Sequence, residues 1–239
     1  ISIFSIVFAS NWININTFEK ETPEFKLVNS DIENSFLEIE FDDFYLESIL
    51  IDGLNYHAVK IPNGASNLNA GCPDIPHIAK SIIIPDNIYM QVEVIESEYV
   101  EYSNILLAPS KGNLSRNINP DDIDYEFNDV YNQNMYYPEN IVELREPYIL
   151  RDFRGQTVVA TPFQYNPIEQ KLRVFTKIKV NVFDNGLSSL NVLNRDKELS
   201  SITNEYKNIY EKHFINFNQD VRFDYLVDQG NMLIISFGD

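Results

Sequence analysis

The single cysteine and its nearest histidine are the pair of side chains that could act as a nucleophile and its base. Cys72 and His77 lie in a segment stiffened by two prolines, 71–77. A thiol becomes nucleophilic when a base within hydrogen-bond reach takes its proton. Free cysteine is, however, among the most buried residue types, and it packs as a small hydrophobe. We therefore expect a packed Cys72 and a surface His77 rather than a catalytic pair.

A short acidic segment is the other place where chemistry is conceivable. Its carboxylates are those of Asp121, Asp122, Asp124, Glu126 and Asp129. Calcium would suit such a cluster, but the loop spacing with glycine at its sixth position is absent. We expect a solvated acidic loop, with no metal site and no cofactor. The motifs of serine hydrolases, zinc peptidases, P-loops and dinucleotide sites are also absent, and the glycosylation sequon at 113–115 is a weak signal.

Charge and composition restrict the class of protein. The chain has 239 residues, and 18 basic against 36 acidic residues give a net charge of −18. This charge disfavours a nucleic-acid partner, because cationic side chains dominate affinity for the phosphate backbone. Hydrophobic residues make up 44% of the chain, with only 8 glycines and 11 prolines. That is enough apolar material for a packed core, so we expect a globular protein.

Alternating hydrophobicity from about residue 36 to 183 predicts a mainly β fold. The run 36–41 alternates between apolar and mostly charged positions, and the run 88–102 places Met90, Val92 and Val94 on one face. A two-residue period gives a sheet one packed face and one solvated face. Repeated short strands of this kind predict an antiparallel β-sandwich or open barrel.

Two local signals refine this fold. The apolar runs 157–165 and 172–183 flank the segment 166–170, whose Asn-Pro start predicts a hairpin turn. After Leu193 the period changes to three and four residues, which predicts one helix at about 200–215. Ser200 or Ser201 is placed to cap its first turn.

The two ends of the chain differ from this β-rich domain, which we assign to 11–215. Residues 1–10 resemble the end of a secretory signal, with an edge strand as the alternative. The polar stretch 216–230 predicts an exposed linker. The apolar run within 231–239 is typical of a buried parallel strand, so we expect it to begin a second, α/β domain. The protein is therefore expected outside the cytoplasm, without a membrane span in its mature chain.

Four long strings, in order along the chain, carry a family likeness. They are GCPDIPHIAKSIIIPD (71–86), LLAPSKGNLSRNINP (106–120), YYPENIVELREPYILRDFRGQTVVATPFQYNPIEQKLRVFTKIKVNVF (136–183) and YKNIYEKHFINF (206–217). Over roughly residues 45–238 the chain resembles the N-terminal propeptide of the gingipain family of secreted cysteine peptidases.

The resemblance implies an inhibitory propeptide. In that family it is β-rich, folds beside its peptidase, assists the folding of that peptidase and blocks its active site until cleavage. The implied partner is the chain's own C-terminal caspase-like peptidase domain, whose first strand would lie in 231–239. The catalytic Cys and His belong to that domain, so we expect no catalytic residue here.

Such an inhibitor needs a long exposed loop, and the segment 127–140 is the candidate. We expect Asn132, Gln133, Asn134, Met135 and Tyr136 to lie across the cleft. In arginine-specific members an arginine fills the specificity pocket, whereas 117–144 contains neither Lys nor Arg. Either Met135 or an asparagine fills a differently shaped pocket, or Arg116 or Arg145 reaches it from the flanks. An ordinary surface loop is the remaining alternative.

Other arginines have separate expected roles. Arg222 matches the junction arginine of the family, so we predict cleavage between Arg222 and Phe223, with Lys212 as the alternative. Arg151 and Arg154 alternate as on a strand, which would place both on one face. We expect them to pair with carboxylates or pack on aromatic rings instead of filling a pocket.

A different class of function is also compatible with the sequence. A free-standing β-sandwich module on the cell surface could bind a ligand through its 14 tyrosines and acidic face. Tyrosine is favoured in β-sheets generally, so this feature separates the two interpretations only weakly.

Overall fold

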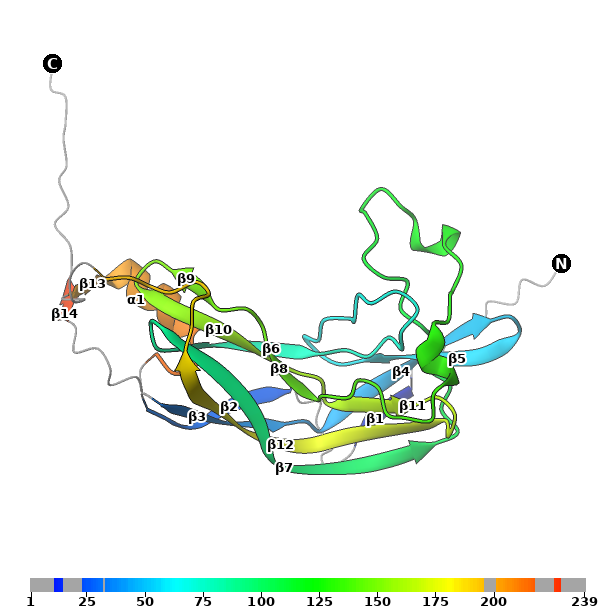
Figure 1. The fold of residues 1–239 in the computed structure, drawn as a ribbon. Helices are drawn as coiled ribbons and strands as arrows, with labels where there is room; N and C mark the ends of the chain where they lie inside the picture. The colour runs from blue at the N-terminus through cyan, green and yellow to red at the C-terminus, as the bar shows by residue number, and fades with distance from the viewer. Residues whose placement is uncertain (1–10, 15–22, 32, 196–200, 218–225, 229–239) are drawn as a thin grey trace, which may run out of the picture.

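The computed structural model describes residues 11–14, 23–31, 33–195, 201–217 and 226–228 (Figure 1). Within them nearly all regular structure is strand. The strands are β1 (Asn11–Asn14), β2 (Glu24–Ser30), β3 (Asn34–Glu40), β4 (Asp43–Ile51), β5 (Leu54–Lys60), β6 (Ile78–Ile83), β7 (Ile88–Ser103), β8 (Val142–Leu144), β9 (Tyr148–Leu150), β10 (Phe153–Ala160), β11 (Phe163–Asn166), β12 (Lys171–Leu187), β13 (Ser201–Thr203) and β14 (Leu226–Asp228). The helices are α1 (Asn204–His213) and two short 3₁₀ helices, η1 (Pro120–Asp122) and η2 (Asp129–Asn132).

The strands form three open antiparallel sheets and one small parallel pair. The largest has the order β11-β12-β3-β2, with β7 paired along the other side of β12. The second joins β6, β10, β8 and β9, the third joins β1, β4 and β5, and β13 pairs in parallel with β14. In Figure 1, β10 and β6 lie above the layer of β3, β12 and β7, with α1 at one end and β5 at the other. The predicted mainly β, antiparallel fold with one C-terminal helix is confirmed.

The main core lies between these layers and follows the two-residue period. Along β3 the burial alternates strictly, with Leu37 and Ile39 each 1% exposed. On β12, Ile178, Val180 and Val182 are fully buried and pack in the same cluster. The alternation predicted for 36–41 is therefore confirmed, because one face of this sheet covers apolar partners.

Strand β7 departs from the predicted pattern. Met90 is buried, but every residue from 93 to 101 is exposed, including Val94 at 42%. The expectation of a dry face through Val94 was wrong for this part of the strand. The reason is position, since β7 pairs with β12 alone among the described strands and forms an edge of the sheet.

The predicted hairpin is confirmed, with one correction. Strands β11 and β12 pair antiparallel across the turn 167–170. The run 157–165 is not one strand, because Thr161 and Pro162 separate β10 from β11 and the two join different sheets. Proline cannot donate a ladder hydrogen bond, so a break at this point follows from its chemistry.

The C-terminal helix is shorter than predicted. It spans Asn204–His213, and its N-cap residue Thr203 makes no side-chain capping bond. Ser201 does not cap it, because residues 201–203 are extended and pair with β14; Ser200 lies outside the described residues. Within the described part of the chain, no helix is long and apolar enough to cross a membrane.

Candidate functional site

The segment 111–127 stands off from the body of the molecule, and we call it the projecting loop. It is the green loop that rises beside β5 in Figure 1. Every residue from 115 to 122 is exposed. The body ends at Ser110, which is buried, and resumes at Asn128. A loop that carries so little buried surface is available for contact with another molecule.

Gly71 holds both ends of the projecting loop together. Its N–H donates to the Ser110 carbonyl at 2.9 Å, and its own carbonyl accepts from Asn128 N–H at 3.1 Å. Cys72 adds two bonds, since its carbonyl accepts from Ser110 N–H and its Sγ from Asn128 Nδ2. Gly71 has a φ of +77°, and a Cβ there would lie 3.1 Å from that of Asn128. The position therefore favours glycine both conformationally and sterically.

The loop is braced internally. Lys111 Nζ donates to the Pro120 carbonyl at 2.8 Å and lies 4.1 Å from the ring centroid of Tyr125. Within the loop, Ile118 N–H donates to the Ser115 carbonyl at 2.9 Å, closing a turn whose central residues include Arg116. The loop thus has a defined shape, which lowers the ordering entropy lost when it binds.

Arg116 is the basic residue that this turn presents. It is exposed, and within the described part of the chain no ion pair to it is found. The other candidate arginine, Arg145, lies on the body after β8 and pairs with Glu143 at 3.2 Å. The structure therefore places Arg116 and Arg145 in different surroundings.

The segment 127–140, predicted as the inhibitory loop, lies against the body. Tyr131 Oη donates to the Leu107 carbonyl at 3.0 Å, and Tyr137 exchanges two backbone bonds with Tyr165. Tyr136 Oη donates to Glu101 at 2.7 Å. Between these anchors the side chains of residues 132–135 are exposed, Met135 at 45%.

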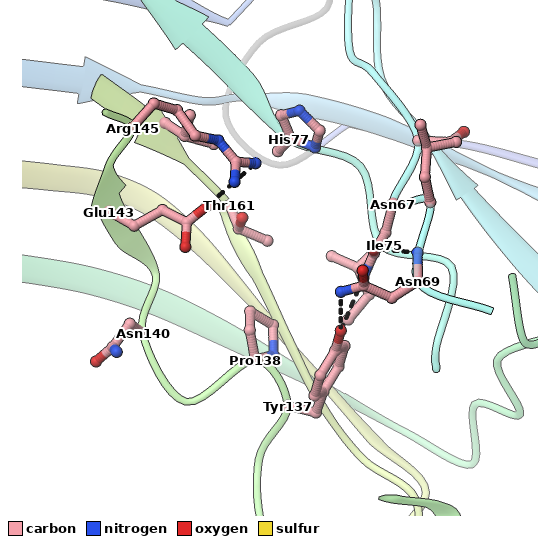
Figure 2. Close-up of a pocket in the computed structure, with 13 residues that line it drawn as sticks. Asn67, Asn69, Ile75, His77, Tyr137, Pro138, Asn140, Glu143, Arg145 and Thr161 are labelled. Atoms are coloured by element: carbon pink, nitrogen blue, oxygen red, sulfur yellow. Dashed lines mark hydrogen bonds and ion pairs between the residues drawn. The ribbon is translucent and has the colours of Figure 1, made fainter. Parts of the chain in front are cut away.

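A polar hollow of ≈ 410 Å³ separates Arg145 from Tyr137. Figure 2 shows the Arg145–Glu143 pair on one side and Tyr137 on the other, where Asn67 Nδ2 donates to its hydroxyl at 2.9 Å. His77 also lines it, and burial together with the Arg145 charge lowers the pKa of this imidazole. These groups suit polar contacts, and the hollow contains no thiol to act as a nucleophile.

A second hollow of ≈ 360 Å³ lies at the base of the projecting loop and contains a half-buried ion pair. Lys60 Nζ is 3.6 Å from Asp74 Oδ2, and Asp74 Oδ1 is buried without a hydrogen-bond partner. Burial raises the pKa of the Asp74 carboxyl, and Lys60 only partly opposes this effect. Tyr125 of the loop lines the same hollow.

The other sequence candidates are placed as follows. Cys72 is half-buried with an amide as its sulfur partner, and His77 is half-buried rather than on the surface. Among the described residues, no three His, Cys, Asp or Glu side chains come together as a metal site. Asn113 of the sequon is exposed on the projecting loop. Arg222 and Phe223 lie outside the described residues, as do 1–10 and 231–239.

The prediction that Arg151 and Arg154 share a face was wrong. Residues three apart on a strand point to opposite faces, and Arg151 in addition lies in the turn between β9 and β10 with a φ of +49°. Its guanidinium is 3.6 Å from Asp152 and 3.7 Å from the ring centroid of Tyr206, as expected for pairing and packing. Arg154 is 1% exposed and donates to neutral oxygens instead of a carboxylate.

Sequence reasoning missed Gly71 and did not single out the projecting loop 111–127. The available signals were turn residues within 111–121, which include Gly112, Asn119 and Pro120. Nothing local could show that Gly71 bonds to residues 39 and 57 positions further on, namely Ser110 and Asn128.

The comparisons with known proteins agree with this architecture. The family Propeptide_C25 matches residues 16–222. Gingipain R1 of Porphyromonas gingivalis is 35% identical over 170 residues, covering 67% of this chain and 17% of that protein. Gingipain R2 of the same organism is 31% identical over 195 residues, covering 82% of this chain and 26% of that protein. The chain thus spans about a quarter or less of the length of these relatives.

Two solved structures share the fold. A complex of Porphyromonas gingivalis RgpB pro- and mature domains matches with a TM-score of 0.75 and 29% identity, covering 82% of this chain and 98% of the other. A structure concerned with zymogenic latency of gingipain K from that organism matches with a TM-score of 0.62 and 20% identity, over 74% and 100% of the two chains. The chain therefore belongs to the gingipain propeptide family, Propeptide_C25.

Proposed function

We propose that this chain is the inhibitory and folding-assisting propeptide of an exported gingipain-like cysteine peptidase, and that its projecting loop blocks the active-site cleft until cleavage. The observation that carries the proposal is the braced, exposed loop 111–127 on a propeptide-family fold. The similarity to a solved complex of pro- and mature domains supports a peptidase domain as the partner.

A preformed loop is suited to inhibiting a peptidase, for reasons that do not depend on the family match. A peptidase cleft binds extended backbone together with an anchoring side chain. The bonds at Gly71 and Lys111 hold the loop in one shape before binding. Less conformational entropy is then lost on association, so more of the contact energy appears as affinity.

Within the loop, Arg116 is the side chain we propose for the specificity pocket. It is exposed at the turn, whereas Arg145 is paired on the body and Met135 lies on a segment anchored by Tyr131 and Tyr136. A guanidinium in a desolvated pocket is a common hot spot of binding energy. Residues 132–136 then act as a flanking contact surface instead of the anchor.

Inhibition measurements test this assignment. We expect the wild-type chain to inhibit the peptidase of the same precursor, and Arg116→Ala to raise the inhibition constant at least about 30-fold, the equivalent of losing about 2 kcal/mol. Arg145→Ala and Met135→Ala are matched surface controls with small expected effects. A larger loss from Met135→Ala than from Arg116→Ala would transfer the anchor to the segment 127–140, and absence of inhibition by the wild type would refute the function.

Processing completes the proposal. The family match ends at residue 222, which supports a junction at Arg222. We expect the matured peptidase to begin at Phe223, and N-terminal sequencing checks this directly. A mature N-terminus at His213 would instead indicate cleavage after Lys212, inside α1.

Assistance in folding is tested separately. Denatured peptidase domain is refolded with and without this chain in trans, and we expect recovered activity only after refolding with the chain and its later removal. Equal recovery without the chain would leave inhibition as its only role. The comparisons lend no support to the alternative of a free-standing cell-surface binding module.

A further inference from the structure

The outer side of β7 is a sheet edge that no other described strand covers. Strand β7 spans Ile88–Ser103, and among the described strands it pairs with β12 alone. Its residues 93–101 are all exposed, with Ile95 at 55% and Tyr99 at 49%. An edge of this length offers a row of backbone donors and acceptors to another strand.

Charged side chains of alternating sign lie side by side across this sheet. The last side chain of each row, on β7, is a glutamate. In one row, Glu96 of β7 faces Lys179, which faces Glu38 of β3. The Lys179 Nζ is 2.6 Å from Glu96 and 4.0 Å from Glu38. In the next row, Glu98 faces Lys177.

The two edge glutamates differ in their ion pairing. Glu96 is paired with Lys179, although half of its side chain remains exposed. Lys177 pairs with Glu38 at 3.0 Å and Glu40 at 3.9 Å, both on β3. Within the described part of the chain no ion pair to Glu98 is found, so its charge is left for a partner beyond the edge. Opposite charges directly across a strand pair are favourable and like charges unfavourable.

A groove accompanies the edge. A hollow of ≈ 370 Å³ lies between β7 and the segment 139–142, lined on the β7 side by Val92, Val94, Ser97 and Tyr99. Ser97 and Val94 face the opposite side of the strand from Glu96, since they pair with the buried Ile178 and Val180. An added strand would therefore meet carboxylates on one face and mostly apolar side chains on the other.

We propose that β7 accepts an extended segment of another polypeptide as an added strand, one with lysine or arginine at alternate positions and apolar residues between them. The basic side chains would face Glu96 and Glu98 and continue the alternation of sign. The apolar side chains would enter the groove beside Val94. Backbone hydrogen bonds would supply affinity and the side-chain pattern specificity. This inference does not depend on the inhibitory function.

A second copy of this chain fits the edge poorly. Pairing β7 with itself would bring the glutamate rows of two molecules together without any lysine between them. Charged residues on an edge can also serve only to prevent such association. That purely protective role predicts no preference for a basic strand, so binding experiments distinguish it.

The strand that already pairs with β7 supplies the probe. A labelled peptide copying residues 176–183, TKIKVNVF, carries the two lysines in the required spacing, and TEIEVNVF is its charge-reversed control. We expect the full chain to bind the lysine peptide at least tenfold more tightly in fluorescence anisotropy. Hydrogen exchange on the unmodified chain should show new protection within 93–101 on binding. Equal binding of both peptides, no binding, or protection elsewhere would overturn the proposal.

Charge reversal on the protein provides the matched test. The double variant Glu96→Lys, Glu98→Lys should reverse the preference, favouring the glutamate peptide. The double variant Glu24→Lys, Glu33→Lys changes the net charge equally at β2 and its turn and should keep the wild-type preference. The proposal would be overturned if the first variant kept its unfolding transition and still preferred the lysine peptide. Dimers that form with rising protein concentration and exclude the peptide would also overturn it.

Discussion

Arg154 is a buried cation whose hydrogen-bond partners are all neutral. Its guanidinium donates to the carbonyls of Asn191, Pro85, Ile88 and Leu190 and to Ser188 Oγ, at 2.6–3.2 Å. These oxygens belong to the chain at the start of β7 and to the residues that follow β12. One buried side chain thus donates to four backbone carbonyls from two separate segments of the chain.

We expect Arg154→Met to destabilise the protein by at least about 3 kcal/mol, because the five hydrogen bonds of this buried guanidinium are lost together. Arg151→Met, three residues away, removes an exposed cation that contacts Tyr206 and should cost far less. Urea unfolding of the two variants checks this difference. Similar midpoints for both would mean that water replaces the Arg154 guanidinium.

The Asp74 carboxyl should give stability an unusual pH dependence. Burial raises its pKa above the ordinary 3.8, so the folded state holds this proton more tightly than the unfolded chain does. The stabilising contribution is then complete below pH 3.8 and is lost as pH rises through the folded pKa. Relative to Asp74→Asn, the wild type should become less stable as the pH rises above 3.8 and through the raised pKa of the folded state. Denaturant titrations at several pH values measure this, and a difference that grows in favour of the wild type would contradict it.

At the scale of elements, α1 is docked on β10 by aromatic packing that needs a glycine. Phe214 and Tyr210 form a second small core with Phe153, and Tyr210 Oη donates to Asp152 at 2.6 Å. A Cβ on Gly155 would lie 2.5 Å from Phe214 Cε1 and 2.8 Å from Tyr148 Cζ. The strand therefore lets the helix end approach closely because one side chain is missing.

Gly155→Ala should destabilise the protein by roughly 1–3 kcal/mol through overpacking. Gly186→Ala is the control, since a Cβ there meets nothing within 4 Å and only its φ of +94° opposes the change. That backbone effect is about 1 kcal/mol. Thermal unfolding compares the two, and local loosening of α1 in the first variant should appear as faster hydrogen exchange in residues 204–213. Equal exchange in both variants would show that the aromatic rings give way freely.

At the scale of the whole molecule, the net charge of −18 acts at a distance. If the proposed peptidase partner has a basic cleft rim, the excess carboxylates would steer the two together. The association rate should then fall severalfold when the ionic strength rises from about 0.05 to 0.5 M, as screening shortens the reach of the field. Stopped-flow mixing measures this, and a rate independent of salt would exclude steering.

Much of the fold could be predicted because it follows from local patterns. The alternation along β3, the turn at 167–170 and the change of period before α1 each lie within a few residues of their effect. The errors occurred where distant contacts override such patterns. Pairing with β14 keeps 201–203 extended, and the edge position of β7 exposes Val94.

The candidate site was only partly predictable for the same reason. Exposure of Arg116 agrees with its turn-rich surroundings, but the anchoring of 127–140 depends on Leu107, Tyr165 and Glu101. The bonds to Leu107 and Tyr165 use backbone carbonyls, which do not require a particular side chain, and the side chain of Glu101 lies 35 residues before Tyr136 in the sequence. Contacts of both kinds therefore leave no local signal in composition or periodicity.

By itself, the sequence determined the β-rich class, the strong negative charge and the membership of the propeptide family, since each depends on residue types and their order along the chain. Only the tertiary structure decided which loop projects, how Gly71 closes its ends, and that the acidic edge of β7 has β12 as its one partner among the described strands. Those features arise from contacts between segments far apart in the chain. The free energy of such contacts depends on where the residues lie in space, which only the folded chain defines.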